Sequence, residues 1–285
     1  MRIILCSIAT LLLAFAVNAQ GFSGGFKAGL NFNQFSGPQE GNDEMSFEDF
    51  KTSTGFHVGA TFAYAFTDLV GIKGELMYSQ KGGEIAYEGP GYVFFYPDSD
   101  EEFFRQATVT QELSITNSYI DIPITAYYRI GPIEVEGGFN MGLQISSRGS
   151  GSVRYTGFNN FIIDELALNY DANFNSDGPG AESIVSFNPD PLPGLPLPSV
   201  IGGNYNSDRS DNRYQRLDFG LVFGAAVFVN SGLYLGIRYN HGLTDVTKSE
   251  NDLRISELET NGRRLFNEDD EDFNRSIQAS IGFRF

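Results

Sequence analysis

The stretch from Asn274 to Phe285, which reads N-R-S-I-Q-A-S-I-G-F-R-F, decides the fold of this chain. Apolar and polar residues alternate along it, which is typical of a β-strand with two unlike faces. One face carries Ile277, Ala279, Ile281, Phe283 and Phe285, and the other carries Gln278, Ser280, Gly282 and Arg284. A final strand that stops on an aromatic residue favours a transmembrane barrel, in which the apolar face meets lipid and the polar face lines the lumen.

The first 19 residues predict a secretory signal peptide. Arg2 is a short positive region, residues 3–17 are apolar, and Val17-Asn18-Ala19 supplies the small residues that suit signal peptidase before Gln20. The apolar run is shorter than the roughly 20 residues of a spanning helix, which argues against an anchor. Cys6 leaves with the signal, so we expect the mature domain, residues 20–285, to have neither disulfides nor thiol chemistry.

The composition also favours β-structure. The chain has 33 Gly, 26 Phe and 14 Tyr but no Trp, and no later stretch is apolar enough to form a membrane helix. A membrane location therefore requires a closed barrel. The formal net charge of −17 argues against nucleic acid as a partner, because such binding needs clustered Lys and Arg.

Alternation along the rest of the chain predicts an all-β fold, an eight-stranded antiparallel transmembrane β-barrel. The expected strands are 26–33, 56–66, 70–81, 119–130, 133–147, 214–229, 233–244 and 274–285. Three tight turns, 67–69, 131–132 and 230–232, alternate with four long loops, 37–52, 82–112, 148–213 and 245–273. Short periplasmic turns and long extracellular loops are typical of bacterial outer-membrane barrels. A soluble lipocalin-like barrel is the competing fold, but its outer face should be polar.

Three segments carry a family resemblance. The segments 25–36 (G-F-K-A-G-L-N-F-N-Q-F-S), 119–123 (Y-I-D-I-P) and 281–285 (I-G-F-R-F) resemble the PorT-like, "porin family" outer-membrane β-barrel proteins of Bacteroidota. The resemblance covers nearly all of the mature chain and implies the outer membrane as its location. It also implies that the barrel assembly machinery reads the C-terminal strand. These are strand motifs with no catalytic signature, and the family label does not itself establish transport.

The polar faces of the expected strands supply a set of charges for the lumen. These residues are Lys27, Lys73, Glu75, Asp121, Arg129, Glu134, Glu136, Arg216, Asp218, Arg238 and Arg284. Side chains fill the interior of an eight-stranded barrel, and desolvated charges there must pair. We therefore expect a charge-plugged lumen. A small-solute porin lined by the same residues is the alternative, and it would require more strands or a displaced network.

The sequence gives little support for catalysis or metal binding. His57 and His241 lie near strand ends, but no serine and aspartate spacing completes a triad, so a rim lipid-modifying enzyme is only a second alternative. The run from Asp171 to Glu182 has oxygen ligands at alternate positions, but Ser176 stands where a calcium loop needs glycine. We therefore expect no catalytic residues, no metal and no cofactor.

Acidic residues concentrate in the four long loops. These loops carry a net charge of −20, although the whole chain carries only −17. Such loops are expected to be solvated and outward-facing. The sequence thus predicts a structural or interaction barrel held in outer-membrane lipid, whose acidic surface loops contact an unknown extracellular ligand.

Overall fold

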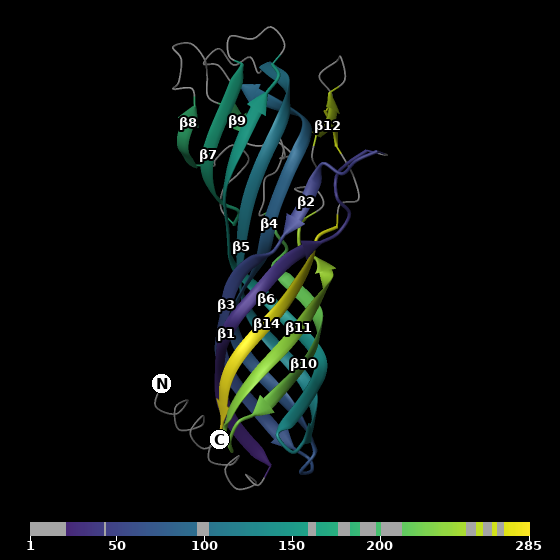
Figure 1. Ribbon diagram of the computed structural model, residues 1–285, viewed down its shortest axis with the longest axis vertical. Helices are drawn as coiled ribbons and strands as arrows, with labels where there is room; N and C mark the ends of the chain where they lie inside the picture. Colours follow the sequence, from purple (N-terminus) through teal and green to yellow (C-terminus); the bar gives the residue numbers. More distant parts are fainter. Residues whose placement is uncertain are drawn as a thin grey trace, which may run out of the picture.

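The computed structural model describes residues 21–42, 44–95, 103–158, 164–175, 183–188, 198–200, 213–248, 255–258, 264–266 and 271–285. Eight strands of this part close into a ring (Figure 1). They are β1 (Phe22–Ser36), β3 (Ser53–Ala65), β4 (Val70–Phe95), β5 (Phe103–Ile130), β6 (Ile133–Thr156), β10 (Leu217–Phe228), β11 (Leu233–Asp245) and β14 (Phe273–Arg284). Their order is β10-β11-β14-β1-β3-β4-β5-β6, and β6 pairs antiparallel with β10 to close the ring.

Three short turns join neighbouring strands at the lower end, where the C-terminus also lies (Figure 1). Two of them are held by a side-chain oxygen that accepts backbone hydrogen bonds. Thr67 Oγ1 accepts from the amides of Leu69 and Val70 at 3.2 and 3.0 Å, and Asn230 Oδ1 accepts from those of Gly232 and Leu233 at 3.0 and 2.7 Å. At the third turn Gly131 has φ = +57°, which glycine adopts without strain. The three predicted turns are therefore present.

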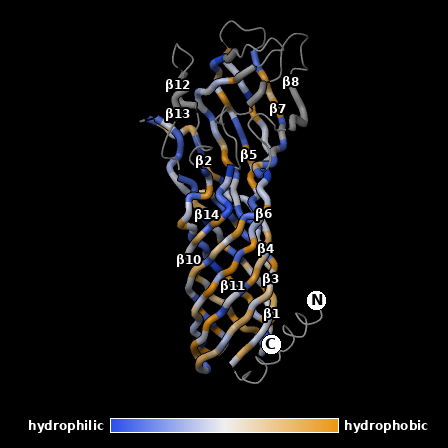
Figure 2. The backbone as a smooth tube through the Cα atoms, turned by 180° about the vertical axis from the view of Figure 1, so that it is seen from behind, coloured by the Kyte–Doolittle hydropathy of each residue, from blue (hydrophilic) through white to orange (hydrophobic). Residues whose placement is uncertain are grey.

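The lower barrel has an apolar outer face and a polar inner face. On β1, for example, Phe26, Leu30 and Phe32 are exposed, whereas Lys27 and Asn31 are buried. The same pattern recurs on all eight strands, and hydrophobic positions recur along the lower barrel in Figure 2. Contact between such an apolar surface and water is unfavourable, whereas its contact with the hydrocarbon of a bilayer is favourable. The outer face therefore excludes the soluble lipocalin-like alternative. In the part of the chain that the structure describes, no helix is long and apolar enough to cross a membrane.

Above this level β4, β5 and β6 continue as a sheet extension with the opposite polarity (Figure 1). On β5, Val109, Leu113 and Ile115 are buried, whereas Thr110 and Glu112 face outward and are exposed. The register between β5 and β6 shifts here, because Ser118 pairs with Ser146 and Tyr119 with Gln144. The extra residue, Ile145, changes which residues of β6 face inward from even to odd numbers.

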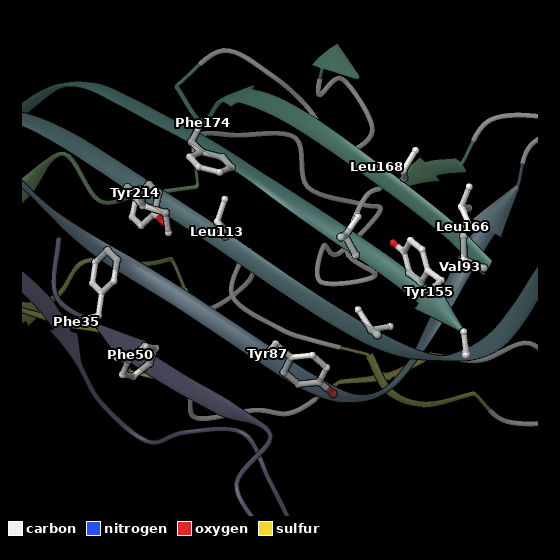
Figure 3. Packing of buried hydrophobic residues seen from close by; sticks show 14 of the residues in the cluster. Phe35, Phe50, Tyr87, Val93, Leu113, Tyr155, Leu166, Leu168, Phe174 and Tyr214 are labelled. Carbon is white, nitrogen blue, oxygen red and sulfur yellow. The ribbon is translucent and has the colours of Figure 1, made fainter. Parts of the chain in front are cut away.

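Further strands widen the extension. They are β2 (Glu48–Lys51) and β9 (Pro198–Val200), which pair with β4, and β7 (Glu165–Asn173) and β8 (Ser183–Asn188), which follow β6. A separate two-stranded sheet contains β12 (Ile255–Leu258) and β13 (Arg264–Phe266). The inner face of the extension holds a hydrophobic core, shown in Figure 3. It includes Phe35, Phe50, Tyr87, Leu113, Tyr155, Leu166, Phe174 and Tyr214. This core lies above the polar lumen and belongs to the extracellular end.

The long connections differ from the prediction. The expected loop 82–112 contains the upper halves of β4 and β5, and the expected loop 148–213 contains the upper part of β6 together with β7, β8 and β9. The loop 37–52 contains β2, and the loop 245–273 contains β12 and β13. We predicted that each strand ends where its outward-facing apolar residues end. In β4, β5 and β6 the strand continues beyond that level, and its apolar residues there face inward. The predicted signal peptide lies outside the described residues.

Candidate functional site

Strand alternation places charged side chains at successive levels inside the lower barrel. Seven of them form one connected group, the lower ion-pair cluster: Lys27 from β1, Lys73 and Glu75 from β4, Glu134 and Glu136 from β6, Arg238 from β11 and Arg284 from β14. The cluster is almost completely shielded, since Glu75 and Arg238 are only 3% and 4% exposed. Charges buried to this degree must be paired and hydrogen-bonded.

The central contact of this cluster joins opposite walls of the barrel. Arg238 donates from Nη1 to Glu75 Oε2 at 2.8 Å and from Nη2 to Glu75 Oε1 at 2.9 Å. In the ring, β11 and β4 are separated by three strands in either direction, so this two-pronged bond crosses the lumen. Lys27 Nζ lies 2.7 Å from the same carboxylate. Bidentate arginine–carboxylate bonds are among the strongest polar contacts in proteins.

Two carboxylates of β6 connect the other cations. Glu136 accepts from Arg238 Nη2 at 2.7 Å and also pairs with Lys73. Glu134 accepts from Lys73 Nζ at 3.2 Å and from Arg284 Nη2 at 2.6 Å. Every charged group of the cluster therefore has at least one partner of opposite sign, and the contacts reach from β1 and β14 to β4 and β6.

A second group, the Lys81 cluster, lies nearer the extracellular end. Lys81 Nζ donates to Asp121 Oδ1 and to Asp218 Oδ2, both at 2.9 Å. Asn140 and Asn274 add bonds to these carboxylates at 2.9 and 3.0 Å. The two clusters together contain five cations and five anions, so their formal charges balance. Lys81 was not among the predicted lumen residues because the predicted third strand ended there, although its position follows Lys73, Glu75 and Ser79 on the inner face.

Two predicted lumen residues lie outside both clusters. Arg216 is exposed and precedes β10, which starts only at Leu217, so it does not face the lumen. Arg129 lies beside the lower turn, where its Nε donates to the carbonyl of Gly131 at 3.3 Å and its guanidinium covers the ring of Phe228 at 3.8 Å. The structure therefore brings together the other nine predicted residues in two clusters rather than one.

His57, a candidate for rim catalysis, lies inside the barrel. Its Nδ1 is 2.6 Å from Asn31 Oδ1, and its Nε2 is 2.8 Å from Ser280 Oγ. Asn31 Nδ2 donates to the carbonyl of Gln80 at 2.7 Å, which directs its Oδ1 toward the ring. His57 therefore carries its proton on Nδ1, and Nε2 accepts from the serine hydroxyl.

This serine–histidine–asparagine chain has the hydrogen-bond order of a catalytic triad. However, His57 is only 1% exposed and faces the lumen at the level of outward-facing Leu30 and Phe56, not the rim. His241, the other candidate, faces outward on β11, where its Nδ1 is 3.4 Å from the hydroxyl of Tyr239. The two histidines therefore do not form a common site.

Several buried polar atoms of the lumen have no hydrogen-bond partner among the described residues. They include Asn33 Oδ1, Asn140 Oδ1, Asp218 Oδ1, Ser276 Oγ and Gln278 Oε1. Within the described ranges no three His, Cys, Asp or Glu side chains lie where they could hold a metal ion. Asp177, Gly178 and Glu182 of the calcium-like run fall outside those ranges.

At the extracellular end, Asp272 is a buried acid. Its Oδ2 accepts from Thr247 Oγ1 at 2.9 Å, and its amide donates to Asp245 Oδ1 at 3.0 Å. Burial, reinforced by the nearby carboxylate of Glu48, raises the pKa of Asp272 to about 6. The acid therefore changes charge within the physiological pH range.

Comparisons with known proteins agree with this architecture. The family model described as "Outer membrane protein beta-barrel domain" matches residues 18–248, most of the chain. This chain belongs to that family. It is therefore an outer-membrane protein, and its eight-stranded barrel is the fold expected for this location. No match to a curated protein was found.

Solved structures with a similar fold are distant in sequence. The barrel is 11% identical to Ail, the attachment invasion locus protein of Yersinia pestis, over 93% of this chain and 99% of Ail, with a TM-score of 0.33. It is 12% identical to OprG from Pseudomonas aeruginosa (93% and 96% covered, TM-score 0.39). It is also 12% identical to Neisserial surface protein A, NspA (93% and 98% covered, TM-score 0.31).

Proposed function

We propose that this outer-membrane protein is a structural or interaction barrel whose lumen is closed by its own ion pairs and whose extracellular end contacts a ligand outside the cell. The observation that carries the proposal is the bond between Arg238 and Glu75, which connects opposite walls at the centre of the lumen. A second bridge, from Lys81 on β4 to Asp218 on β10, crosses the lumen at a higher level.

The energetics also favour a closed lumen. Breaking one buried ion pair leaves an uncompensated charge, which costs about 3–5 kcal/mol. A solute that passed through the lumen would have to displace several pairs of the lower ion-pair cluster together. At the lower mouth Arg284 covers the ring of Phe228 at 4.7 Å, and Phe228 and Tyr127 are both buried. The hydrophobic core of the extension covers the upper end.

The extracellular extension is the part that remains available for contact. Its outer face is polar, and Glu84, Glu88 and Glu112 are exposed on β4 and β5. Because the extension has its own hydrophobic core, it offers a firm platform for the acidic loops. The ligand that we propose is therefore extracellular and approaches a negatively charged surface, which also disfavours nucleic acid.

We also propose the barrel assembly machinery as a partner during biogenesis. The C-terminal strand β14 ends at Arg284, and the residue after it, Phe285, is 75% exposed. The Phe285 backbone exchanges hydrogen bonds of 2.8 and 3.1 Å with Gly24 of β1, so this strand also completes the ring. The strand motifs at 25–36, 119–123 and 281–285 support the narrower proposal that the chain is a PorT-like "porin family" barrel of Bacteroidota.

A liposome-swelling assay tests the closed lumen. Liposomes that contain the refolded protein are diluted into isotonic arabinose, glycine or glucose, with an open porin as positive control. We expect no swelling above empty liposomes. Swelling that falls as the solute becomes larger would support the alternative of a small-solute porin, which the unpartnered polar atoms near Ser276 and Gln278 favour.

The protein is proposed not to be an enzyme. A fluorophosphonate probe distinguishes a non-enzymatic barrel from the alternative of a lipid-modifying enzyme. The probe labels a serine that an adjacent histidine activates. We expect no labelling, since His57 is only 1% exposed and lies within the closed lumen. Labelling that disappears in Ser280→Ala would establish catalysis instead.

A further inference from the structure

Two adjacent rows of side chains lie near the upper end of the lipid-facing surface on β11, β14 and β1. The lower row contains Tyr239, Ile277 and Phe32, which are direct partners in the two strand registers and are all exposed. The next row up contains His241, Arg275 and Gln34, again direct partners in register. The outer face thus changes from apolar to polar and cationic within one step of alternation.

A cavity of about 500 Å³ lies over this boundary. Its apolar part is formed by Phe32, Tyr239 and Ile277, and its polar part includes Arg275, Gln34 and Asp49. The cavity volume is within the range of small-molecule sites. A ligand that fits both parts must be amphipathic, with a hydrocarbon portion toward the membrane and a polar portion toward the outside.

Arg275 is positioned to bind an anion. Its Nη1 donates to the carbonyls of Gly242 and Asn274 at 2.7 and 3.0 Å, which fixes the guanidinium on the outer wall. Its Nε and Nη2 have no hydrogen-bond partner among the residues that the structure describes. Guanidinium groups bind phosphate through two parallel N–H bonds, so the free donors match a phosphate group.

The remaining polar groups favour a sugar attached to that phosphate. Gln34 Nε2 donates to the carbonyl of Phe50 at 2.7 Å, so its Oε1 faces outward as an acceptor. Asp49 is exposed on β2 and supplies a second acceptor at the upper side of the cavity. A carboxylate repels a bare phosphate but accepts hydrogen bonds from sugar hydroxyls. Together with Arg275, the two acceptors Gln34 and Asp49 therefore suit a phosphorylated sugar better than a simple phospholipid headgroup.

We infer that the surface formed by Arg275, Gln34 and Asp49 above Tyr239, Ile277 and Phe32 binds the phosphorylated sugar headgroup of an outer-leaflet glycolipid. The phosphate lies on Arg275, the sugar hydroxyls face Gln34 and Asp49, and an acyl chain follows the apolar row toward the membrane. This site is on the outer wall, so it does not depend on whether the lumen conducts.

Native mass spectrometry of the full refolded protein in detergent tests the inference. The probes are diphosphorylated lipid A, chemically dephosphorylated lipid A, phosphatidylglycerol and soluble glucose 1-phosphate. We expect diphosphorylated lipid A to bind at least tenfold more tightly than each of the others. Equal binding of phosphatidylglycerol would overturn the sugar requirement, and equal binding of glucose 1-phosphate would overturn the lipid as source.

Variants assign the binding to this surface. Arg275→Gln should weaken lipid A binding at least tenfold, whereas Arg154→Gln, which removes another outward arginine on β6, should leave it unchanged. Asp49→Asn lies on β2 outside the ring, and it should weaken binding severalfold even if Arg275→Gln fails to refold. Wild-type affinity in the folded Arg275→Gln protein, or in Asp49→Asn, would overturn the proposed site.

Discussion

At the residue scale, the most informative feature of the molecule is the pairing of charges inside the barrel. Alternation alone was sufficient to place Lys27, Glu75 and Arg238 on the inner face, because one face of a transmembrane strand must be apolar. The pairs themselves were not predictable, since they depend on strand register and on which walls lie opposite. Arg216 was placed wrongly in the lumen because sequence defines the first residue of a strand poorly. Lys81 was missed for the same reason, since sequence also defines the last residue of a strand poorly.

Removing one carboxylate of the lower ion-pair cluster should strongly destabilise the barrel. Glu75→Gln leaves Lys27 and Arg238 without their main partner, and we expect a loss of about 3–5 kcal/mol in the free energy of unfolding. Urea unfolding in detergent or lipid, followed by heat-modifiable migration, measures this loss. The matched control is Glu112→Gln, whose partner Lys51 lies 3.8 Å away in an exposed pair, with an expected change below about 1 kcal/mol. Equal effects would contradict a buried, paired cluster.

Acidification should stabilise the extracellular end through Asp272. The pKa of Asp272 in the folded protein is about 6, above the ordinary value near 4. The contribution of its protonation to the free energy of unfolding is therefore complete below about pH 4 and is lost as the pH rises through 6. It amounts to at most about 2–3 kcal/mol. Glu48, Asp245 and Arg213 are the charged groups that face it.

The measurement is protease protection of the extracellular end at pH 5 and at pH 7.5. Wild-type protein should be better protected at pH 5, and Asp272→Asn should remove much of the difference. A variant with the same pH dependence as the wild type would show that another group is responsible.

At the scale of elements, the sheet extension is the part that sequence patterns failed to predict. The alternation of apolar and polar residues continues between Lys81 and Glu112. There the apolar residues, such as Tyr87, Val109 and Leu113 nearby, face a hydrophobic core instead of lipid. On β6 the extra residue Ile145 also changes which residues face inward, so a continuous pattern is interrupted. A search for odd-numbered apolar residues on β4 and β5 beyond the lipid-facing stretch would have revealed the extension.

The extension and the barrel should respond separately to core mutations. Leu113→Ala removes a buried side chain from the upper core and should destabilise the extension by about 2–5 kcal/mol. The barrel below should keep its heat-modifiable migration. Thr110→Ala, on the exposed outer face of the same strand, should have little effect. Limited proteolysis of the extension measures both, and equal cleavage rates for the two variants would contradict a packed extracellular core.

At the scale of the whole molecule, two opposite arrangements of polarity share one set of strands. The lower barrel is apolar outside and charged inside, whereas the extension is polar outside and apolar inside. The eight strands, the three turns and the outer-membrane location were predictable because lipid imposes them on the sequence. The sheet extension was not predictable, since its alternation of outward polar and inward apolar residues is that of any soluble sheet. This division leaves the extracellular end, rather than the lumen, as the proposed place of function.

Single-channel conductance in a planar bilayer tests the closed lumen most directly, by comparing the wild-type protein with Glu134→Gln/Glu136→Gln. These substitutions remove two carboxylates that pair with Lys73, Arg238 and Arg284. A wild-type protein that inserts, shows heat-modifiable migration and remains electrically silent is the predicted result. Steady wild-type conductance that changes in the double variant would contradict the closed lumen and make a solute pore the primary function.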